Sequence, residues 1–110
     1  MNKPLIVVNF KTYESASGDT AIKLAKAMDN FSDRDFRMIA VVSAFDLSSI
    51  TNAVQGVEVW SQHLDPVGKG SHTGWLEPDL ALHHGAVGTI INHAEHKVSL
   101  ENVEKLMAML

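Results

Sequence analysis

The chain has 110 residues, of which 45% are apolar and 20% charged, with a formal net charge of −4 and no cysteine. This length indicates one domain with a modest core, and the apolar fraction excludes a disordered tail. The acidic balance, without a basic cluster, disfavours nucleic-acid binding. The lack of cysteine excludes disulfides, thiolate metal sites and a cysteine nucleophile. No apolar run approaches the ~20 residues of a membrane span, so we expect a soluble cytoplasmic protein with no membrane partner.

Apolar runs and capping residues predict four strands alternating with four helices. The strands are expected at four short apolar runs, of which the first two read as buried on both faces: 5–8, 38–42, 57–60 and 86–91. The helices are expected to open at Ser17-Gly18-Asp19, after Asp46 as cap, at Pro78 and after Ser99 as cap. Residues 64–75 are rich in Gly and polar side chains and predict a long loop, a feature that is often functional.

Strands that alternate with helices predict a parallel sheet with right-handed crossovers. Such a sheet either stays open, with helices on both faces, or closes into a (βα) barrel, which needs eight βα units and ~250 residues. The predicted elements make four such units, and the last helix stops on the apolar Leu110 without a cap. We therefore expect the sequence to end partway through a fold.

Polar side chains follow three of the predicted strands at the point where each strand ends: Asn9 and Lys11, Gln62 and His63, and Asn92 and His93. The carboxyl ends of parallel strands meet at one rim, so these groups predict a site for an anionic, hydrogen-bonding small molecule. Each residue also has a purely structural interpretation. Asn9 would cap a turn, Lys11 would be a solvated cation, and His93 would be a satisfied structural histidine.

Two other motifs give weaker evidence of function. His93 and His96 follow a strand rather than lying within a helix, and HExxH spacing is absent, so no metal site is predicted. Gly68-Lys69-Gly70-Ser71 lacks the earlier glycine and the residue order of a phosphate loop, and it does not open a helix. We discard it as a nucleotide motif.

Taken in register, the motifs resemble the triosephosphate isomerase family. Asn9-Phe10-Lys11 is similar to the family's Asn-x-Lys, Gly70-Ser71-His72-Thr73-Gly74 to its third loop, and Asn92-His93-Ala94-Glu95 to its catalytic-histidine segment. The segments Val-Asn-Phe-Lys-Thr-Tyr and Gln-His-x-Asp-Pro are typical of its short archaeal-type members. Order and spacing agree over essentially all of the sequence.

The resemblance implies that residues 1–110 are the N-terminal half of a TIM-barrel domain. This is an α/β fold, a (βα)4 half of a (βα)8 barrel with four parallel strands. The family interconverts dihydroxyacetone phosphate and D-glyceraldehyde 3-phosphate through an enediolate, in glycolysis and gluconeogenesis, without metal or cofactor. The resemblance also implies a homo-oligomer, a dimer or tetramer, in which Thr73 at the tip of the third loop reaches into a neighbouring subunit.

The same resemblance implies roles for the rim residues. Asn9 and Lys11 would bind the substrate, with Lys11 supplying positive charge to the phosphate and the enediolate. His93 would be the electrophile that polarises the carbonyl as a neutral imidazole, a role for which this family is a standard example. Glu95 would hold the lysine and the local network, and Gln62 would support the rim.

Some features depart from the family pattern. The glutamate base, the lid loop and the phosphate loops belong to later strands that this sequence does not contain, so we expect the 110-residue chain alone to be inactive. Ala94 replaces the usual serine, and His96-Lys97 stands where an arginine-bearing pair is common. Two alternatives stay open: a non-catalytic half-barrel that binds phosphorylated metabolites or serves as an assembly module, and an unrelated four-stranded α/β protein.

Overall fold

A computed structural model describes residues 3–32 and 34–110 and contains one parallel sheet. The strands β1 (Leu5–Asn9), β2 (Arg37–Val42) and β3 (Glu58–Ser61) lie side by side in chain order. The register pairs Val7 with Ile39 and Val41 with Trp60. The predicted α/β class with a parallel sheet is therefore confirmed.

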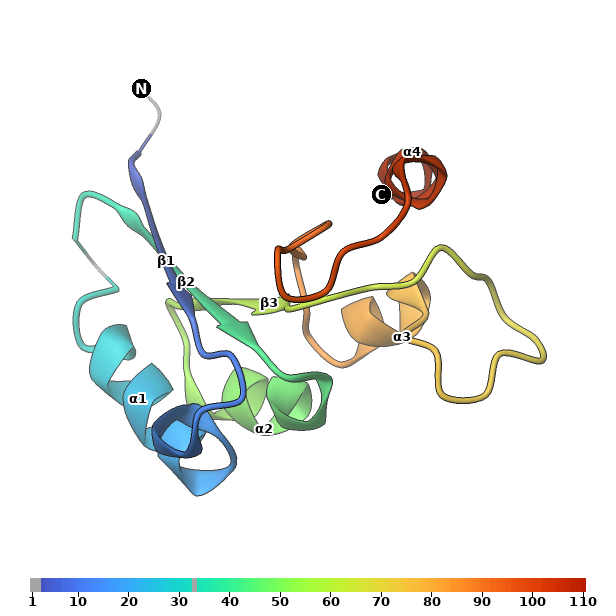
Figure 1. The fold of residues 1–110 in the computed structure, drawn as a ribbon. Coiled ribbons are helices and arrows are strands. Elements are labelled where there is room, and N and C mark those ends of the chain that lie inside the picture. Colours follow the sequence, from blue (N-terminus) through green and yellow to red (C-terminus); the bar gives the residue numbers. More distant parts are fainter. Residues whose placement is uncertain (1–2, 33) are drawn as a thin grey trace.

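Four α-helices follow the predicted pattern: α1 (Asp19–Asp29), α2 (Leu47–Ala53), α3 (Pro78–His83) and α4 (Leu100–Met109). Two short 3-10 turns, η1 (Glu14–Ala16) and η2 (Ala44–Asp46), precede α1 and α2. Helices α1 and α2 lie next to each other against β2 and β3, whereas α4 stands at the far end of the molecule (Figure 1). Within the described ranges, no helix has the length and apolar character needed to cross a bilayer.

The predicted fourth strand, residues 86–91, is wrong as a full strand. This segment runs parallel to β3 and forms a single bridge between Thr89 and Ser61. Three backbone hydrogen bonds of 3.0–3.1 Å join it to Val59 and Ser61. Gly88 weakens the segment as a strand because it has no side chain to pack. A Cβ at that position would lie 2.4 Å from the Trp60 indole, so the ring lies directly against the backbone.

The sheet buries its centre and exposes its first strand. In β2, all residues after Arg37 are buried, as predicted. In β1, however, Leu5, Ile6 and Val7 are 43–48% exposed, so the prediction that this run is buried on both faces is wrong. The reason is that β1 is an edge strand, paired only with β2 among the described residues. Its outer row of N–H and C=O groups is thus open to another strand.

The apolar stripe of α4 is Val103, Leu106, Met107 and Leu110, which predicts one buried face, but the helix buries a narrower one. Leu106 is 1% exposed, but Met107 and Leu110 are 67% and 64% exposed. The Ser99 side chain caps the helix as predicted, accepting the N–H of Asn102 at 3.1 Å. Because α4 lies at the end of the molecule, only one side of the helix meets the core.

The prediction that Asp46 caps α2 is wrong. Its backbone is already helical and its side chain makes no cap hydrogen bond, because η2 runs directly into α2. The capping side chain is instead Ser43, which accepts the N–H of Phe45 at 3.2 Å. Asp46 Oδ2 accepts the N–H of Gly18 at 3.1 Å, so it links η2 to the start of α1.

Asp29 fastens the end of α1 to the turn before β3. Its two carboxylate oxygens accept the N–H groups of Gly56 at 2.9 Å and Gln55 at 3.0 Å. Burial raises the pKa of Asp29, but these N–H donors act in the opposite direction and leave the pKa below its usual value. The carboxylate therefore stabilises the helix-to-strand connection in its ionised form.

Candidate active site

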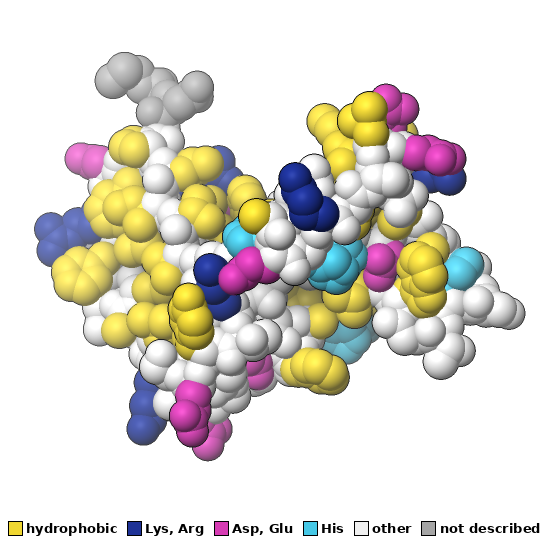
Figure 2. Space-filling model, viewed as in Figure 1, with side chains coloured by type: hydrophobic (Ala, Val, Ile, Leu, Met, Phe, Trp, Pro, Cys, Tyr) yellow, Lys and Arg dark blue, Asp and Glu magenta, His cyan; other side chains and the backbone are white. Residues whose placement is uncertain are grey.

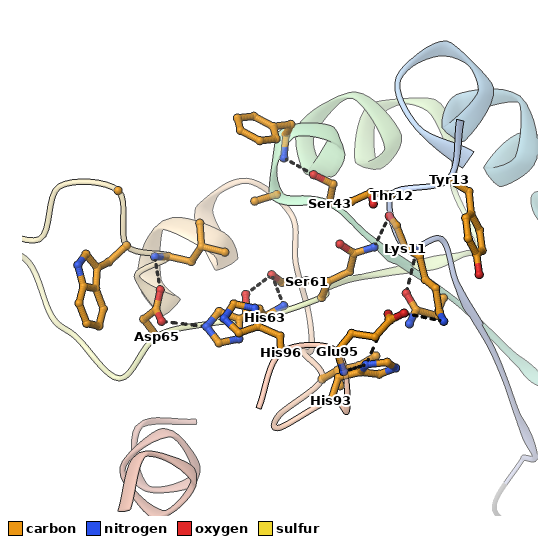
Figure 3. A pocket seen from close by; sticks show the side chains of 18 residues that line it. Lys11, Thr12, Tyr13, Ser43, Ser61, His63, Asp65, His93, Glu95 and His96 are labelled. Atoms are coloured by element: carbon orange, nitrogen blue, oxygen red, sulfur yellow. Dashed lines mark hydrogen bonds and ion pairs between the residues drawn. The ribbon is translucent and has the colours of Figure 1, made fainter. Parts of the chain in front are cut away.

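A cavity of about 1020 Å³ opens where the strands end (Figure 3). Several parts of the chain line it, including the residues after β2 and the long loop before α3. The polar side chains among them include Asn9 at the end of β1 and Lys11 beyond it, Gln62 and His63 after β3, and His93, Glu95 and His96 from the segment after Ile91. In the space-filling view, histidine, lysine and acidic side chains gather at the middle of this face (Figure 2). The structure thus brings five of the six rim residues predicted from sequence to a single cavity. The exception is Asn92, whose Oδ1 accepts the N–H of Val98 at 3.0 Å.

Lys11 occupies this rim in an unusual backbone conformation. Its φ is 51°, in the left-handed region that non-glycine residues rarely adopt. Its N–H donates to Asn9 Oδ1 at 3.0 Å, and its carbonyl accepts the Gln62 Nε2–H at 2.8 Å. Asn9 and Gln62 therefore hold both peptide groups of Lys11, which offsets the conformational cost at this position.

The Lys11 ammonium lies between a carboxylate and an aromatic ring. Its Nζ donates to Glu95 Oε2 at 3.1 Å and lies 5.8 Å from the centre of the Tyr13 ring. The hydrogen bond to Glu95, together with the charge of that carboxylate, raises the pKa of Lys11. The lysine is thus a fixed positive charge at the edge of the cavity.

The His93 ring is held in one tautomer. The backbone N–H of Glu95 donates to His93 Nδ1 at 3.0 Å, so Nδ1 carries a lone pair and the proton of the neutral ring is on Nε2. Glu95 Oε1 lies 3.7 Å from the same Nδ1, which is too long for a hydrogen bond. His93 can therefore offer a neutral Nε2–H donor.

A second histidine of this segment, His96, packs on the end of β3. Its ring stacks on His63, with ring centres 3.7 Å apart and planes 9° from parallel. His63 Nε2 in turn lies 2.9 Å from Asp65 Oδ1. The strand-end pattern predicts His63 at the rim, but we assigned no function to His63, Asp65 or His96 from the sequence. The spacing of Asp65 two residues after His63 could have indicated that the two side chains form a pair.

Thr73 lies outside the cavity. It belongs to the long loop between β3 and α3, which projects from the body of the molecule (Figure 1). Thr73 is exposed. Within this loop, Lys69 donates to the buried Glu77, which lies at the loop's end just before α3. That hydrogen bond lowers the pKa of Glu77. The loop therefore presents Thr73 to solvent.

The site presents several hydrogen-bond donors to the cavity. In residues 3–32 and 34–110, no cluster of three or more His, Asp or Glu side chains is placed to hold a metal ion. The Lys11 ammonium, the Asn9 amide and the His93 Nε2–H lie at the same cavity. Such donors stabilise anionic groups and the negative charge that develops on a carbonyl oxygen.

Comparison with known proteins finds one family over nearly all of the chain. The family model described as triosephosphate isomerase matches residues 4–110. A protein named triosephosphate isomerase from the archaeon Methanothermus fervidus is 35% identical to this chain over 100% of its length. A protein of the same name from Methanococcoides burtonii is 41% identical over 93% of this chain. The match covers 50% of the first relative and 46% of the second, so the chain spans about half the length of the curated relatives it matches.

A solved structure supports the fold. The crystal structure of triosephosphate isomerase from Bartonella henselae superposes with a TM-score of 0.74 over 84% of this chain and 39% of that chain, at 23% sequence identity. At this identity the likeness concerns the fold alone. The family model, which covers nearly all residues, shows that this chain belongs to the triosephosphate isomerase family.

Proposed function

We propose that residues 1–110 are the N-terminal (βα)4 half of a TIM-barrel domain and carry part of the active site of a triosephosphate isomerase. The reaction is the interconversion of dihydroxyacetone phosphate and D-glyceraldehyde 3-phosphate. The supporting observation is the linked trio at the cavity: Lys11 donates to Glu95, and the N–H of Glu95 donates to His93. This trio holds a cation and a neutral N–H donor beside one another.

Lys11, Asn9 and His93 have distinct roles in this proposal. Lys11 and Asn9 bind the substrate, with the ammonium neutralising the phosphate and the charge of the enediolate. His93 Nε2–H donates to the substrate carbonyl oxygen and polarises it. As a neutral donor with its tautomer fixed by Glu95, it stabilises the oxyanion that forms when a base removes the neighbouring carbon-bound proton.

Gln62 and Glu95 support Lys11, and Thr73 has a role in subunit assembly. Gln62 holds the Lys11 carbonyl, and Glu95 holds the Lys11 ammonium. We assign Thr73, on its projecting loop, to the interface of a homo-oligomer. The proposal needs no cofactor and includes a cytoplasmic location, as the sequence predicts.

The glutamate base is not among the residues of this sequence that match family motifs. We therefore propose that the polypeptide 1–110, purified by itself, does not turn over triose phosphates. Glu95 is not a substitute, because it lies next to His93 in the same turn and is paired with Lys11.

A chimera tests the catalytic role. Residues 1–110 are joined to the remaining half of the Methanothermus fervidus relative, and isomerase activity is measured. His93→Gln should lower kcat by about 10²–10⁴-fold with the fold intact. Lys11→Met should lower turnover and also weaken phosphoglycolate binding. His83→Gln, on α3 and outside the cavity, is the control and should have no effect. Near-full kcat in His93→Gln would remove this residue from the mechanism.

A non-catalytic binding module is the second candidate. It is favoured by the fact that the ammonium, amide and imidazole donors are already gathered within residues 1–110. A phosphoglycolate titration of this polypeptide, followed by NMR, separates the two functions. Binding here, together with an inactive chimera, would favour the module over the enzyme.

A further inference from the structure

The stack of His96 on His63 joins two parts of the cavity wall. His63 follows β3, and His96 ends the turn that begins at His93. The two rings lie face to face at 3.7 Å, and Figure 3 shows them overlapping between Asp65 and Glu95. This contact is separate from the Lys11, Glu95 and His93 linkage described above.

The His63 ring is a rigid platform. Its side chain is 12% exposed, and Nε2 lies 2.9 Å from Asp65 Oδ1. The other oxygen, Asp65 Oδ2, accepts the N–H of Leu76 at 2.7 Å, while the Asp65 N–H donates to the Leu76 carbonyl at 2.8 Å. Three hydrogen bonds thus fix the ring on which His96 packs to the base of the long loop.

The turn that carries His93 depends on external attachments. Internally it is closed by the His96 N–H, which donates to the His93 carbonyl at 2.8 Å, and by the Glu95 N–H on His93 Nδ1. Two side-chain interactions attach it to strand ends: the Lys11–Glu95 pair and the His96–His63 stack. An anion in the cavity competes with Glu95 for the Lys11 ammonium. The stack does not involve Lys11 and therefore persists when that ion pair weakens.

We propose that His96 is a positioning residue for His93. By stacking on His63, it holds the turn against β3, so that the Glu95 N–H stays on His93 Nδ1 and the ring proton stays on Nε2. The value of this tautomer for catalysis rests on the function proposed above, but the stacking role itself does not. This role requires a flat ring at position 96, and it does not require that the ring bind or release a proton.

The test uses the whole 110-residue chain with 15N-labelled histidine, at about pH 8, above the usual histidine pKa of about 6.5. Ring 15N shifts report which nitrogen of His93 carries the proton, and Glu95 amide exchange reports the hydrogen bond to Nδ1. If the chain self-associates, the same shifts are recorded by magic-angle spinning on sedimented protein. The variants are His96→Ala, which removes the ring, and His96→Phe, which keeps a flat ring. His83→Ala is the matched control, an exposed histidine outside the cavity.

The proposal expects His96→Ala to bring the two His93 ring 15N shifts toward their average and to speed Glu95 exchange by at least about tenfold, the signature of local opening. His96→Phe and His83→Ala should keep the parent shifts and exchange within about twofold, since an aromatic ring retains the stack. Unchanged His93 shifts in His96→Ala would overturn the proposal.

The same proposal is overturned if His96→Phe behaves like His96→Ala. If His96→Ala does not fold, as judged by circular dichroism, His96→Phe decides alone, because the proposal requires it to match the parent chain. The readout needs neither substrate nor turnover. An inactive chimera would therefore reject the enzymatic role without altering this result, and a failed ring-shift test would leave the enzymatic role standing.

Discussion

Replacing Gly85 by alanine tests how closely the end of α3 packs on α2. Gly85 has a φ of 102°, where an L side chain costs about 1–2 kcal/mol. The added Cβ would lie 2.3 Å from Thr51 Oγ1 and 2.7 Å from Thr51 Cβ. Rotation of the threonine cannot relieve a contact with its own Cβ, so overpacking adds about 1–3 kcal/mol. We expect a total loss of about 2–5 kcal/mol.

That loss is large for a domain of this size, since folded proteins are stable by only about 5–15 kcal/mol. Urea unfolding followed by far-UV circular dichroism measures it. Gly74→Ala is the control for conformation alone, because Gly74 has a φ of 83° and open space around it. It should cost about 1–2 kcal/mol. Gly68→Ala, with open space and no positive φ, should stay within about 0.5 kcal/mol of the parent.

A second substitution separates the two contributions. In the Gly85→Ala background, Thr51→Ala removes Oγ1 and Cγ2 and should recover part of the steric cost, which appears as a coupling energy of at least about 0.5 kcal/mol. The conformational cost should persist. If Gly85→Ala costs no more than Gly74→Ala, or if Thr51→Ala recovers nothing, the inferred contact between α3 and α2 is refuted.

Three further predictions concern Asp29, Ser99 and the exposed edge. Because the pKa of Asp29 is lowered, its stabilisation is complete above about pH 4 and is lost as pH falls through the lowered pKa. The Asp29→Asn variant should therefore lose less unfolding free energy than the parent when the pH falls from neutral to acid. Urea titrations at a series of pH values measure this loss, and an equal loss in both proteins would contradict the prediction. Ser99→Ala should cost about 1 kcal/mol and speed amide exchange in the first turn of α4; unchanged exchange would exclude the cap. The isolated 110-residue chain should self-associate through the open edge of β1 and its exposed Leu5 and Val7; light scattering that gives a 12.0 kDa monomer would reject this.

Local pattern was sufficient to predict most of the fold. The apolar stripe Ala21, Leu24, Ala25 and Met28 predicted α1, and Pro78 and Ser99 predicted the starts of α3 and α4. What the pattern missed depends on neighbours. The run Leu5 to Val8 has the composition of a buried strand whether or not another strand pairs with its outer edge. Likewise, residues 86–91 have strand composition, but they pair on one side only, through three backbone hydrogen bonds and a single bridge.

The site was predictable to the extent that it follows from strand ends. Asn9, Lys11, Gln62 and His93 lie together because parallel strands deliver their ends to one rim. The stack of His96 on His63 was not predictable, because it depends on the path of a turn rather than on any spacing within the sequence. The partner of Asp46 was missed for the same reason, since Gly18 belongs to another element.

The close approach of Trp60 to Gly88 gives this chain an internal optical reporter. The indole is sheltered on one side by the backbone of residues 86–91, so its emission should move to longer wavelength when that segment leaves β3. The chain has two tryptophans, and in a Trp75→Phe background the emission would come from Trp60 alone. Comparing that emission with circular dichroism during unfolding would show whether the last quarter of the chain detaches before the three-stranded sheet melts, or together with it.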